Sequence, residues 1–468
     1  MRRTILVFSI LLMILVLLFC RKEKGESMKF TGAKDEVKLI TVDPGHFHAA
    51  LVQKIMYHQI SDDVHVYAPE GEEVQDHLNR ISGFNQRSDN PTHWKEIVYL
   101  GEDFMAKMVA ENKGNVAIFS GNNKKKTEYL KTAVEAGFNV LADKPMCIDK
   151  NGFELLKQAF ASAAKNKVLL YDIMTERYEI TTILQRELVN MPEVFGTLQS
   201  GTADNPSVTK ESVHHFFKYV AGNPIKRPSW YFDVSQQGEG LVDVTCHLVD
   251  LVQWECFPEK IINYETDVQM IRASHWPTLI TAEMFEKVTR QPQFPDYLKD
   301  KVNAAGVLSV FCNGEMIYQI NGIFTKVSVI WNFEAPAGGG DTHFSVMKGS
   351  QCHVVIKQGN EQNYQPELYV ETPEIEKAES VAAALKQAIE KLQKNYPGIS
   401  LEKYDDGWHI VIPDKYRVGH EAHFSQVTQK YLKFLVDGKL PDWETPNMIA
   451  KYFITTSALV LAQQQNIK

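Results

Sequence analysis

Two short motifs in the sequence contain side chains that suit proton transfer. Asp143, Lys144 and Pro145 follow an apolar run, and Asp243 and His247 stand four residues apart in a second apolar segment. Residues four apart share one face of a helix. A histidine titrates near neutral pH and often acts as a general base, and a lysine can donate to a substrate oxygen. We therefore take Lys144, Asp243 and His247 as candidate catalytic residues.

Both motifs also have structural interpretations. An Asp-Lys-Pro sequence can form a surface turn, and an acid and a histidine at this spacing can satisfy backbone groups in a packed helix. The segment around Asp243 and His247 is otherwise apolar, and a polar group in such a helix needs a partner or a function. The sequence alone leaves these alternatives open.

The first motif belongs to a region in which predicted strands alternate with helices. Helical spacing of apolar residues occurs at 48–57 and 127–136, and short apolar runs occur at 37–42, 64–67, 96–100, 116–119 and 139–142. Such alternation predicts right-handed βαβ units and a parallel sheet that binds ligands at the carboxyl ends of its strands. We predict an α/β, doubly wound Rossmann domain over residues 37–173.

The second motif belongs to a region of different pattern. Residues 174–468 contain β-rich segments separated by Asn-Gly and Gly-Gly turns, with a helix expected at 241–255 and a helix pair at about 423–436 and 447–465. We predict a C-terminal α+β domain with an open, largely antiparallel sheet. Residues of about 365–420 look like an insertion that includes a helix at 374–394.

In this order and on this pattern, the two motifs resemble those of the Gfo/Idh/MocA family of sugar oxidoreductases. Asp143-Lys144-Pro145 is similar to the family's Glu-Lys-Pro motif, and 238–254 is similar to its Gly-Gly…Asp-x-x-x-His-x-x-Asp segment. The resemblance extends over 37–465. It implies an NAD- or NADP-dependent enzyme that oxidises a hydroxyl of a sugar, polyol or glycoside; in a related version of this hypothesis the cofactor stays bound and is recycled. Lys144 would lie between nicotinamide and substrate, His247 would take the hydroxyl proton, and Asp243 would bind substrate or tune His247.

The phosphate loop departs from that family. A dinucleotide fingerprint reads GxGxxG, whereas residues 43–48 read Asp-Pro-Gly-His-Phe-His and keep only Gly45. His46, Phe47 and His48 then stand where the pyrophosphate would bind, and the two imidazoles could donate to it at a helix N-terminus. Glu70, after the second predicted strand, would bind the adenosine ribose.

Further cofactor and substrate residues follow from the same resemblance. Arg177 and Trp230 would bind substrate, although an ion pair at a helix start is an equal explanation for Arg177. The remaining candidate cofactor contacts lie after the fourth and fifth predicted strands: Gly121, Asn122, Asn123, Asp143 and Lys144.

Metal and nucleic acid are not predicted. The six cysteines show no CxxC spacing, and the paired histidines lack a third donor at ligand spacing: His46/His48, His214/His215 and His420/His423. The net charge is -8, and no long basic run is interleaved with aromatic residues, which disfavours nucleic acid as a partner. The open sheet could pair with a second copy, as in related enzymes, so a homo-oligomer is possible.

Residues 1–20 have the pattern of an export signal. Arg2 and Arg3 precede an apolar run that is short for a membrane span and ends at Cys20 in a loose lipobox. We predict a signal peptide over 1–20, lipidation of Cys20 and a charged tether over 21–36. The protein would then be exported and held at the periplasmic face or cell surface. An uncleaved N-terminal anchor is the alternative.

The altered loop and the export signal keep a second function open. A carbohydrate-binding protein, or a non-redox lyase or hydrolase acting on carbohydrate, could use the same scaffold with a degraded nucleotide site. Whether sugar binding depends on dinucleotide would separate the two hypotheses.

Overall fold

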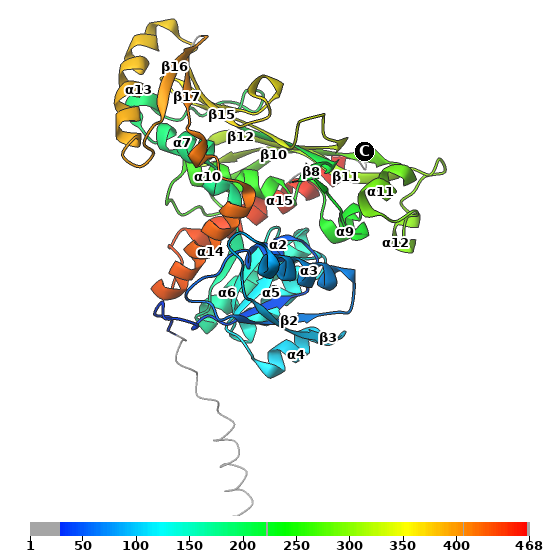
Figure 1. The fold of residues 1–468 in the computed structure, drawn as a ribbon. Coiled ribbons are helices and arrows are strands. Elements are labelled where there is room, and N and C mark those ends of the chain that lie inside the picture. Colours follow the sequence, from blue (N-terminus) through cyan, green and yellow to red (C-terminus); the bar gives the residue numbers. More distant parts are fainter. Residues whose placement is uncertain (1–28, 221–222, 406, 466–468) are drawn as a thin grey trace, which may run out of the picture.

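A computed structural model gives the fold and describes residues 29–220, 223–405 and 407–465. The predicted signal peptide, Cys20 and the first part of the tether, 21–28, lie outside the described residues. Figure 1 shows an N-terminal domain, coloured blue to cyan, below a larger C-terminal domain built on an extended sheet. No helix among the described residues is long and apolar enough to cross a membrane.

The N-terminal domain is built on a parallel six-stranded sheet in the order β3-β2-β1-β4-β5-β6. Most of its strand residues are buried because helices cover both faces, as expected of a doubly wound fold. The predicted Rossmann fold is therefore confirmed. Its strands are β1 (Leu39–Val42), β2 (Asp63–Ala68), β3 (Lys95–Leu100), β4 (Val116–Phe119), β5 (Asn139–Asp143) and β6 (Leu170–Ile173), and its helices are α2 (His48–Leu51), α3 (Glu72–Gln86), α4 (Phe104–Glu111), α5 (Lys126–Glu135) and α6 (Lys150–Asn166).

The helix predicted over 48–57 is mostly absent, since α2 ends at Leu51. Tertiary hydrogen bonds take the backbone carbonyls that a longer helix would use. Trp94 Nε1 donates to Gln53 O at 2.6 Å, and Arg87 Nη2 donates to Lys54 O at 2.6 Å. The apolar residues of this segment are buried or half-buried in irregular structure instead.

The C-terminal domain contains a nine-stranded sheet in the order β10-β11-β12-β7-β13-β14-β15-β17-β16. Only the β12–β7 pair is parallel among its described pairs, so the prediction of a largely antiparallel sheet is confirmed. Its strands are β7 (Val208–Phe217), β10 (Val268–Ile280), β11 (Leu308–Ile320), β12 (Ile323–Glu334), β13 (Thr342–Lys348), β14 (His353–Lys357), β15 (Glu367–Glu371), β16 (Ser400–Tyr404) and β17 (Gly407–Val411), with a separate small hairpin of β8 (Tyr219–Val220) and β9 (Asn223–Pro224).

Helices of the C-terminal region cover this sheet and connect the domains. The segment of about 365–420 adds β15, β16 and β17 to the sheet and packs α13 beside them. The helices are η1 (Thr175–Tyr178), α7 (Ile180–Val189), α8 (Pro192–Phe195), η2 (Ser229–Phe232), α9 (Val234–Gln237), α10 (Thr245–Cys256), α11 (Ala282–Thr289), α12 (Asp296–Lys299), α13 (Ala378–Leu392), α14 (His420–Asp437) and α15 (Glu444–Gln465), with short 3₁₀ turns η3 (Asn360–Gln362), η4 (Ile375–Lys377) and η5 (Asp414–Tyr416).

The last two helices join the domains. Figure 1 shows α14, in orange, lying along the N-terminal domain, and its apolar residues Phe424, Val427 and Tyr431 belong to that domain's core. Helix α15 contacts both α6 and β10. The two domains therefore share buried surface along the chain's C-terminal end, which holds the cleft between them in a defined shape.

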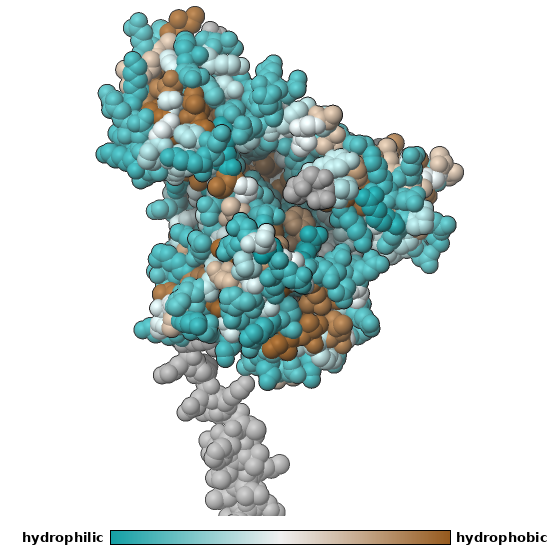
Figure 2. Space-filling view, viewed as in Figure 1, coloured by the Kyte–Doolittle hydropathy of each residue, from teal (hydrophilic) through white to brown (hydrophobic). Residues whose placement is uncertain are grey.

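An apolar patch lies on the edge of the parallel sheet. Figure 2 shows apolar side chains gathered over β3 and α4. Ile97, Val98 and Leu100 of β3 are each at least 40% exposed. This patch lies on the edge strand, away from the carboxyl ends of the central strands where the candidate site residues lie.

Candidate active site

A cavity of about 500 Å³ lies between the two domains. Lys144, at the carboxyl end of β5, and His247, on α10, both line it. The structure thus brings together two residues that are far apart in the sequence. Other lining residues come from both domains: His46, His48, Glu176, Glu179, His214, Arg227, Tyr231, Trp331, Asp341, His343 and His420.

Lys144 is held by Asp243. Its Nζ donates to Asp243 Oδ1 at 2.8 Å, and both side chains are largely buried. Gln237 Nε2 donates to the other carboxylate oxygen at 2.9 Å. Burial disfavours the ammonium, but Asp243 outweighs it and raises the pKa of Lys144 above its ordinary value. Lys144 is therefore a charged donor, and Asp243 positions it. Asp243 is not among the cavity-lining residues, and its contact with substrate stays a prediction.

His247 is a neutral imidazole on the cavity wall. Burial, followed by the charge of Lys144, holds the pKa of His247 well below its ordinary value. Its Nδ1 is buried and has no hydrogen-bond partner within the described ranges. A neutral histidine has a free lone pair, which is the form that a general base requires.

Close backbone packing sets the position of α10. The helix begins at Thr245 rather than at the predicted Leu241, and Asp243 lies in the preceding turn. A Cβ on Gly240 would lie 2.0 Å from Cys312 O on β11, so only glycine fits there. This contact fixes the turn that carries Asp243 toward Lys144 and leads into the helix that carries His247.

The loop of residues 43–48 replaces the glycine fingerprint with a closed turn. Asp43 has a φ of 45°, in the left-handed region where the first glycine would stand. Gly45 N donates to Asp43 O at 2.9 Å, and His46 N donates to Ser120 O at 3.1 Å. A Cβ on Gly121 would lie 2.2 Å from Asp43 O. The loops after β1 and β4 therefore touch, and two of the amides that could face a phosphate already have acceptors.

A second pocket of about 290 Å³ lies on the other side of this loop. Gly45, Glu70 and Asn122 line it together, as do Lys124 and Lys125. These residues come from the carboxyl ends of β1, β2 and β4, the edge at which doubly wound sheets bind ligands. The pocket thus brings three of the predicted cofactor residues to one place.

Asp43 also lines that pocket and changes its charge. Burial and then the charge of Glu73 raise the pKa of Asp43 to about 6. At neutral pH the carboxyl is therefore mostly ionised, but it becomes neutral under mildly acidic conditions.

The two asparagines after β4 connect the domains. Asn122 Nδ2 donates to Gln236 Oε1 at 2.8 Å, and Asn123 Nδ2 donates to Gln237 O at 2.7 Å. Asn123 is buried and does not line either pocket, and its contact with cofactor stays a prediction. These bonds place α9 against the end of β4.

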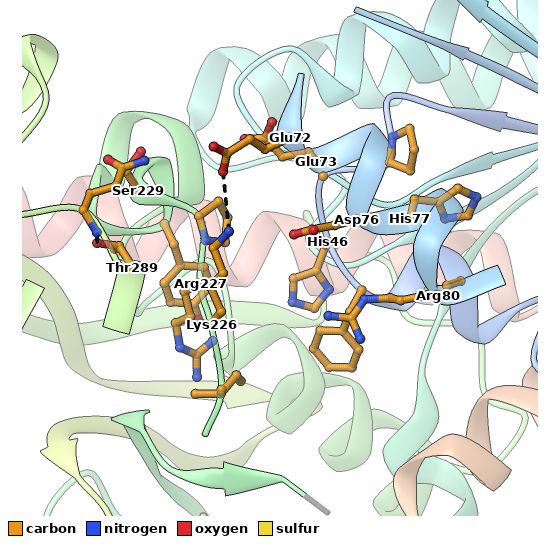
Figure 3. A pocket seen from close by; sticks show the side chains of 18 residues that line it. His46, Glu72, Glu73, Asp76, His77, Arg80, Lys226, Arg227, Ser229 and Thr289 are labelled. Carbon is orange, nitrogen blue, oxygen red and sulfur yellow. Dashed lines mark hydrogen bonds and ion pairs between the residues drawn. The ribbon is translucent and has the colours of Figure 1, made fainter. Parts of the chain in front are cut away.

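A third, small cavity of about 90 Å³ borders both larger ones. Figure 3 shows its wall, with His46 and Arg80 from the N-terminal domain and Lys226 and Arg227 from the C-terminal domain. Glu72 and Lys226 form an ion pair across the gap at 3.4 Å. Phe47 lines this cavity and the large one without filling either.

Two predicted substrate residues lie elsewhere. The Arg177 guanidinium is buried, donating to both oxygens of Asp250 at 2.6 and 2.8 Å and to Glu444 at 2.8 Å, so the ion-pair explanation holds and the substrate prediction is wrong. Trp230 lines the pocket beside Gly45, and its neighbour Tyr231 lines the large cavity instead.

A polar cluster at the far wall of the large cavity is missing from the predicted site. His214 Nδ1 lies 2.9 Å from one Asp341 oxygen, His215 Nδ1 lies 3.3 Å from the other, and Lys218 donates to the same carboxylate. The charges of His214 and Lys218 outweigh burial and lower the pKa of Asp341. His214 stacks on Trp331 at 5.0 Å between ring centroids. The adjacent histidines could have indicated this cluster from the sequence. Asp341 could not, because it follows a run of glycines in which no motif indicates a functional residue.

Comparison with protein families supports the architecture. Residues 184–463 match the family described as "Putative oxidoreductase C terminal domain". A crystal structure of a "putative oxidoreductase" from Parabacteroides merdae is 57% identical, with a TM-score of 0.92, covering 94% of this chain and 100% of that one. The chain belongs to the Gfo/Idh/MocA family of oxidoreductases.

More distant solved structures share the fold. Levoglucosan dehydrogenase in complex with NADH is 11% identical, with a TM-score of 0.58, covering 92% of this chain and 97% of that one. A 3-ketoreductase from Actinomadura kijaniata in complex with NADP is 11% identical, with a TM-score of 0.53, covering 90% and 96%. A comparison with curated proteins finds no match.

Proposed function

We propose that this oxidoreductase oxidises a hydroxyl group of a sugar, polyol or glycoside with NAD or NADP. The observation that carries the proposal is the convergence of Lys144 and His247 on one cavity, with Lys144 charged and His247 neutral. These are the protonation states that alcohol oxidation needs. The levoglucosan and 3-keto substrates named for distant relatives are consistent with this substrate class.

The protein's own groups account for the proton. His247 accepts the hydroxyl proton as the carbon loses hydride, and Lys144 donates a hydrogen bond to the same oxygen and stabilises its developing negative charge. The hydrogen bond and the charge of Asp243 keep the Lys144 ammonium protonated and in position. A bound nicotinamide supplies the acceptor for the hydride.

The residues fit the two ends of a dinucleotide. Glu70 lines the 290 Å³ pocket at the end of β2, where its carboxylate would accept hydrogen bonds from ribose hydroxyls, and Lys124 and Lys125 supply positive charge for phosphate. The loop that would bind the pyrophosphate differs from the usual fingerprint, because the backbone amides of Gly45 and His46 already donate to carbonyl groups of the protein. Phosphate binding would then depend more on lysine charge than on loop amides.

The far wall of the large cavity suits a sugar. Tyr231 and Trp331 offer aromatic faces, and Arg227, His214 and Asp341 offer hydrogen-bonding groups. Aromatic faces pack on the apolar faces of sugars, while the polar groups bind hydroxyls. A cavity of about 500 Å³ is large enough for a small ligand of this class.

Release of nucleotide on denaturation tests the cofactor. We expect the purified protein to release NAD(H) or NADP(H), identified by mass spectrometry, or to bind one on titration. Adding a panel of glycosides should then produce reduced nicotinamide. If no dinucleotide is released or bound, the redox proposal fails.

One observation favours a second function, a carbohydrate-binding protein or non-redox lyase or hydrolase. The loops after β1 and β4 are in backbone contact, which occupies part of the usual nucleotide crevice. Calorimetric sugar binding that is unaffected by added dinucleotide would support this function.

A further inference from the structure

Three side chains that can ligate a metal ion lie close together, and two of them, His46 and His48, line the large cavity. His48 Nδ1 lies 2.9 Å from Asp143 Oδ2, and His46 Nδ1 lies 3.6 Å from the same oxygen. One donor atom from each residue lies within 4.8 Å of the other two. The prediction that this histidine pair lacks a third donor is therefore wrong, because β5 brings Asp143 to it from far along the chain.

The spacing matches a coordination sphere. Zinc binds imidazole nitrogen and carboxylate oxygen at about 2.0–2.2 Å, so neighbouring ligands of one ion lie roughly 3.0–3.5 Å apart. The distances of 2.9 and 3.6 Å to Asp143 Oδ2 bracket this range. All three donors lie within 4.8 Å of one another, so side-chain shifts that bring them to this spacing would place them around one ion.

The surrounding groups resemble the outer shell of a metal site. A metal-bound histidine usually uses its second nitrogen to bond another polar group, which fixes the ring. His48 Nε2 lies 3.2 Å from His420 Nε2, and Ser120 Oγ donates to Asp143 Oδ2 at 2.9 Å. Lys126 donates to the Asp143 backbone carbonyl, not to its carboxylate, and Lys144 is engaged by Asp243.

The other histidine pair of the cavity provides a contrast. His214 and His215 also converge on one carboxylate, Asp341, but the Lys218 ammonium occupies the position that a cation would take. His46, His48 and Asp143 have no ammonium bound between them in the described part of the chain. Only the first cluster thus combines three donors with a free side toward the cavity.

We propose that His46, His48 and Asp143 bind a divalent transition metal of the zinc type. His46 and His48 line the large cavity, so the open coordination positions face the substrate space, where a sugar hydroxyl or keto oxygen would be the additional ligand. In this loop His48 stands at the position of the third glycine of the fingerprint, and His46 follows the retained Gly45. The site does not require nicotinamide and goes beyond the proposed function.

Metal content and cobalt spectroscopy test the site on the full-length, nucleotide-free protein. After removal of metal with a chelator, titration with Zn²⁺ followed by calorimetry should give one tight site per chain. Co²⁺ should give visible absorption typical of nitrogen ligation. If the wild-type protein binds neither ion stoichiometrically, or if Co²⁺ shows only the spectrum of the hydrated ion, the proposal is refuted.

Variants locate the site. His46→Ala and His48→Ala should each weaken Zn²⁺ binding at least about 100-fold, and His420→Ala about 10- to 100-fold. His214→Ala is the matched control and should bind as the wild type does. If His214→Ala and His46→Ala lose the same amount of Zn²⁺ affinity, the assignment of His46 as a metal ligand is wrong. Circular dichroism shows whether each variant is folded. If one of the two histidine variants does not fold, the other variant and the cobalt spectrum of the wild-type protein still test the proposed site. Because no step uses dinucleotide, failure here is distinct from failure of the redox proposal.

Discussion

The Lys144–Asp243 pair makes a sharp prediction about stability. Its side chains are only 14% and 5% exposed, and Nζ and Oδ1 are 2.8 Å apart. Asp243→Asn keeps the shape but leaves a buried ammonium without its counter-charge. Removing one partner of a buried pair costs about 3–5 kcal/mol of the free energy of unfolding. We expect a loss in this range at neutral pH.

The chain contains a matched exposed pair. Lys287 and Glu334 lie 2.7 Å apart, but their side chains are 39% and 47% exposed. Glu334→Gln should therefore cost only about 0–1 kcal/mol. Urea unfolding of both variants beside the wild type measures the difference, and a double variant Lys144→Met with Asp243→Asn should recover part of the loss.

The pH dependence follows from the raised pKa of Lys144. A base whose pKa is higher in the folded than in the unfolded protein stabilises the fold below its unfolded value, and this contribution fades as pH rises through the folded value. The deficit of Asp243→Asn should thus be constant near neutrality and shrink only above about pH 10.5. A loss below 1 kcal/mol, equal to that of Glu334→Gln, would refute the reasoning.

Three further predictions concern the loop, the packing and the N-terminus. Because ionised Asp43 repels phosphate, the Kd for NAD should rise up to about 50-fold between about pH 6 and pH 8, and Asp43→Asn should abolish this rise in a fluorescence titration. Gly240→Ala should destabilise the fold by about 1–3 kcal/mol, because the added Cβ would meet Cys312 O. Gly83→Ala in helix α3 should instead stabilise it by about 0.5–1 kcal/mol, because a Cβ there would have nothing within 4 Å. Thermal unfolding of the two variants measures this difference in stability. If Cys20 is lipidated, Cys20→Ser should move the protein from the membrane fraction to the soluble fraction, and an unchanged distribution would contradict lipidation.

The fold could largely be read from the sequence because most of the parallel strands are short apolar runs buried on both sides, with the edge strand β3 as the exception. Long strands of the second sheet are harder to predict. Most residues of β10 are half-buried or exposed, since it is an edge strand, and its apolar pattern is correspondingly weak. Helix α2 is short because distant side chains take its carbonyl groups, and no local pattern reports such contacts.

The site could be predicted only where local motifs carry it. Lys144 and His247 stand in recognisable patterns, and both line the cavity. Arg177 has the same local appearance as a substrate residue, but Asp250 and Glu444, its partners, are brought to it by tertiary folding. The sequence indicated Asp143 as a candidate cofactor contact beside Lys144, but no local pattern indicated that it lies next to His46 and His48.

Turnover by His247→Ala tests the central claim most directly. With dinucleotide bound and an accepted glycoside present, the wild-type protein should form reduced nicotinamide, and His247→Ala should do so about 10²- to 10⁴-fold more slowly while binding dinucleotide equally well. Full turnover by His247→Ala would show that the imidazole on the cavity wall is not the base.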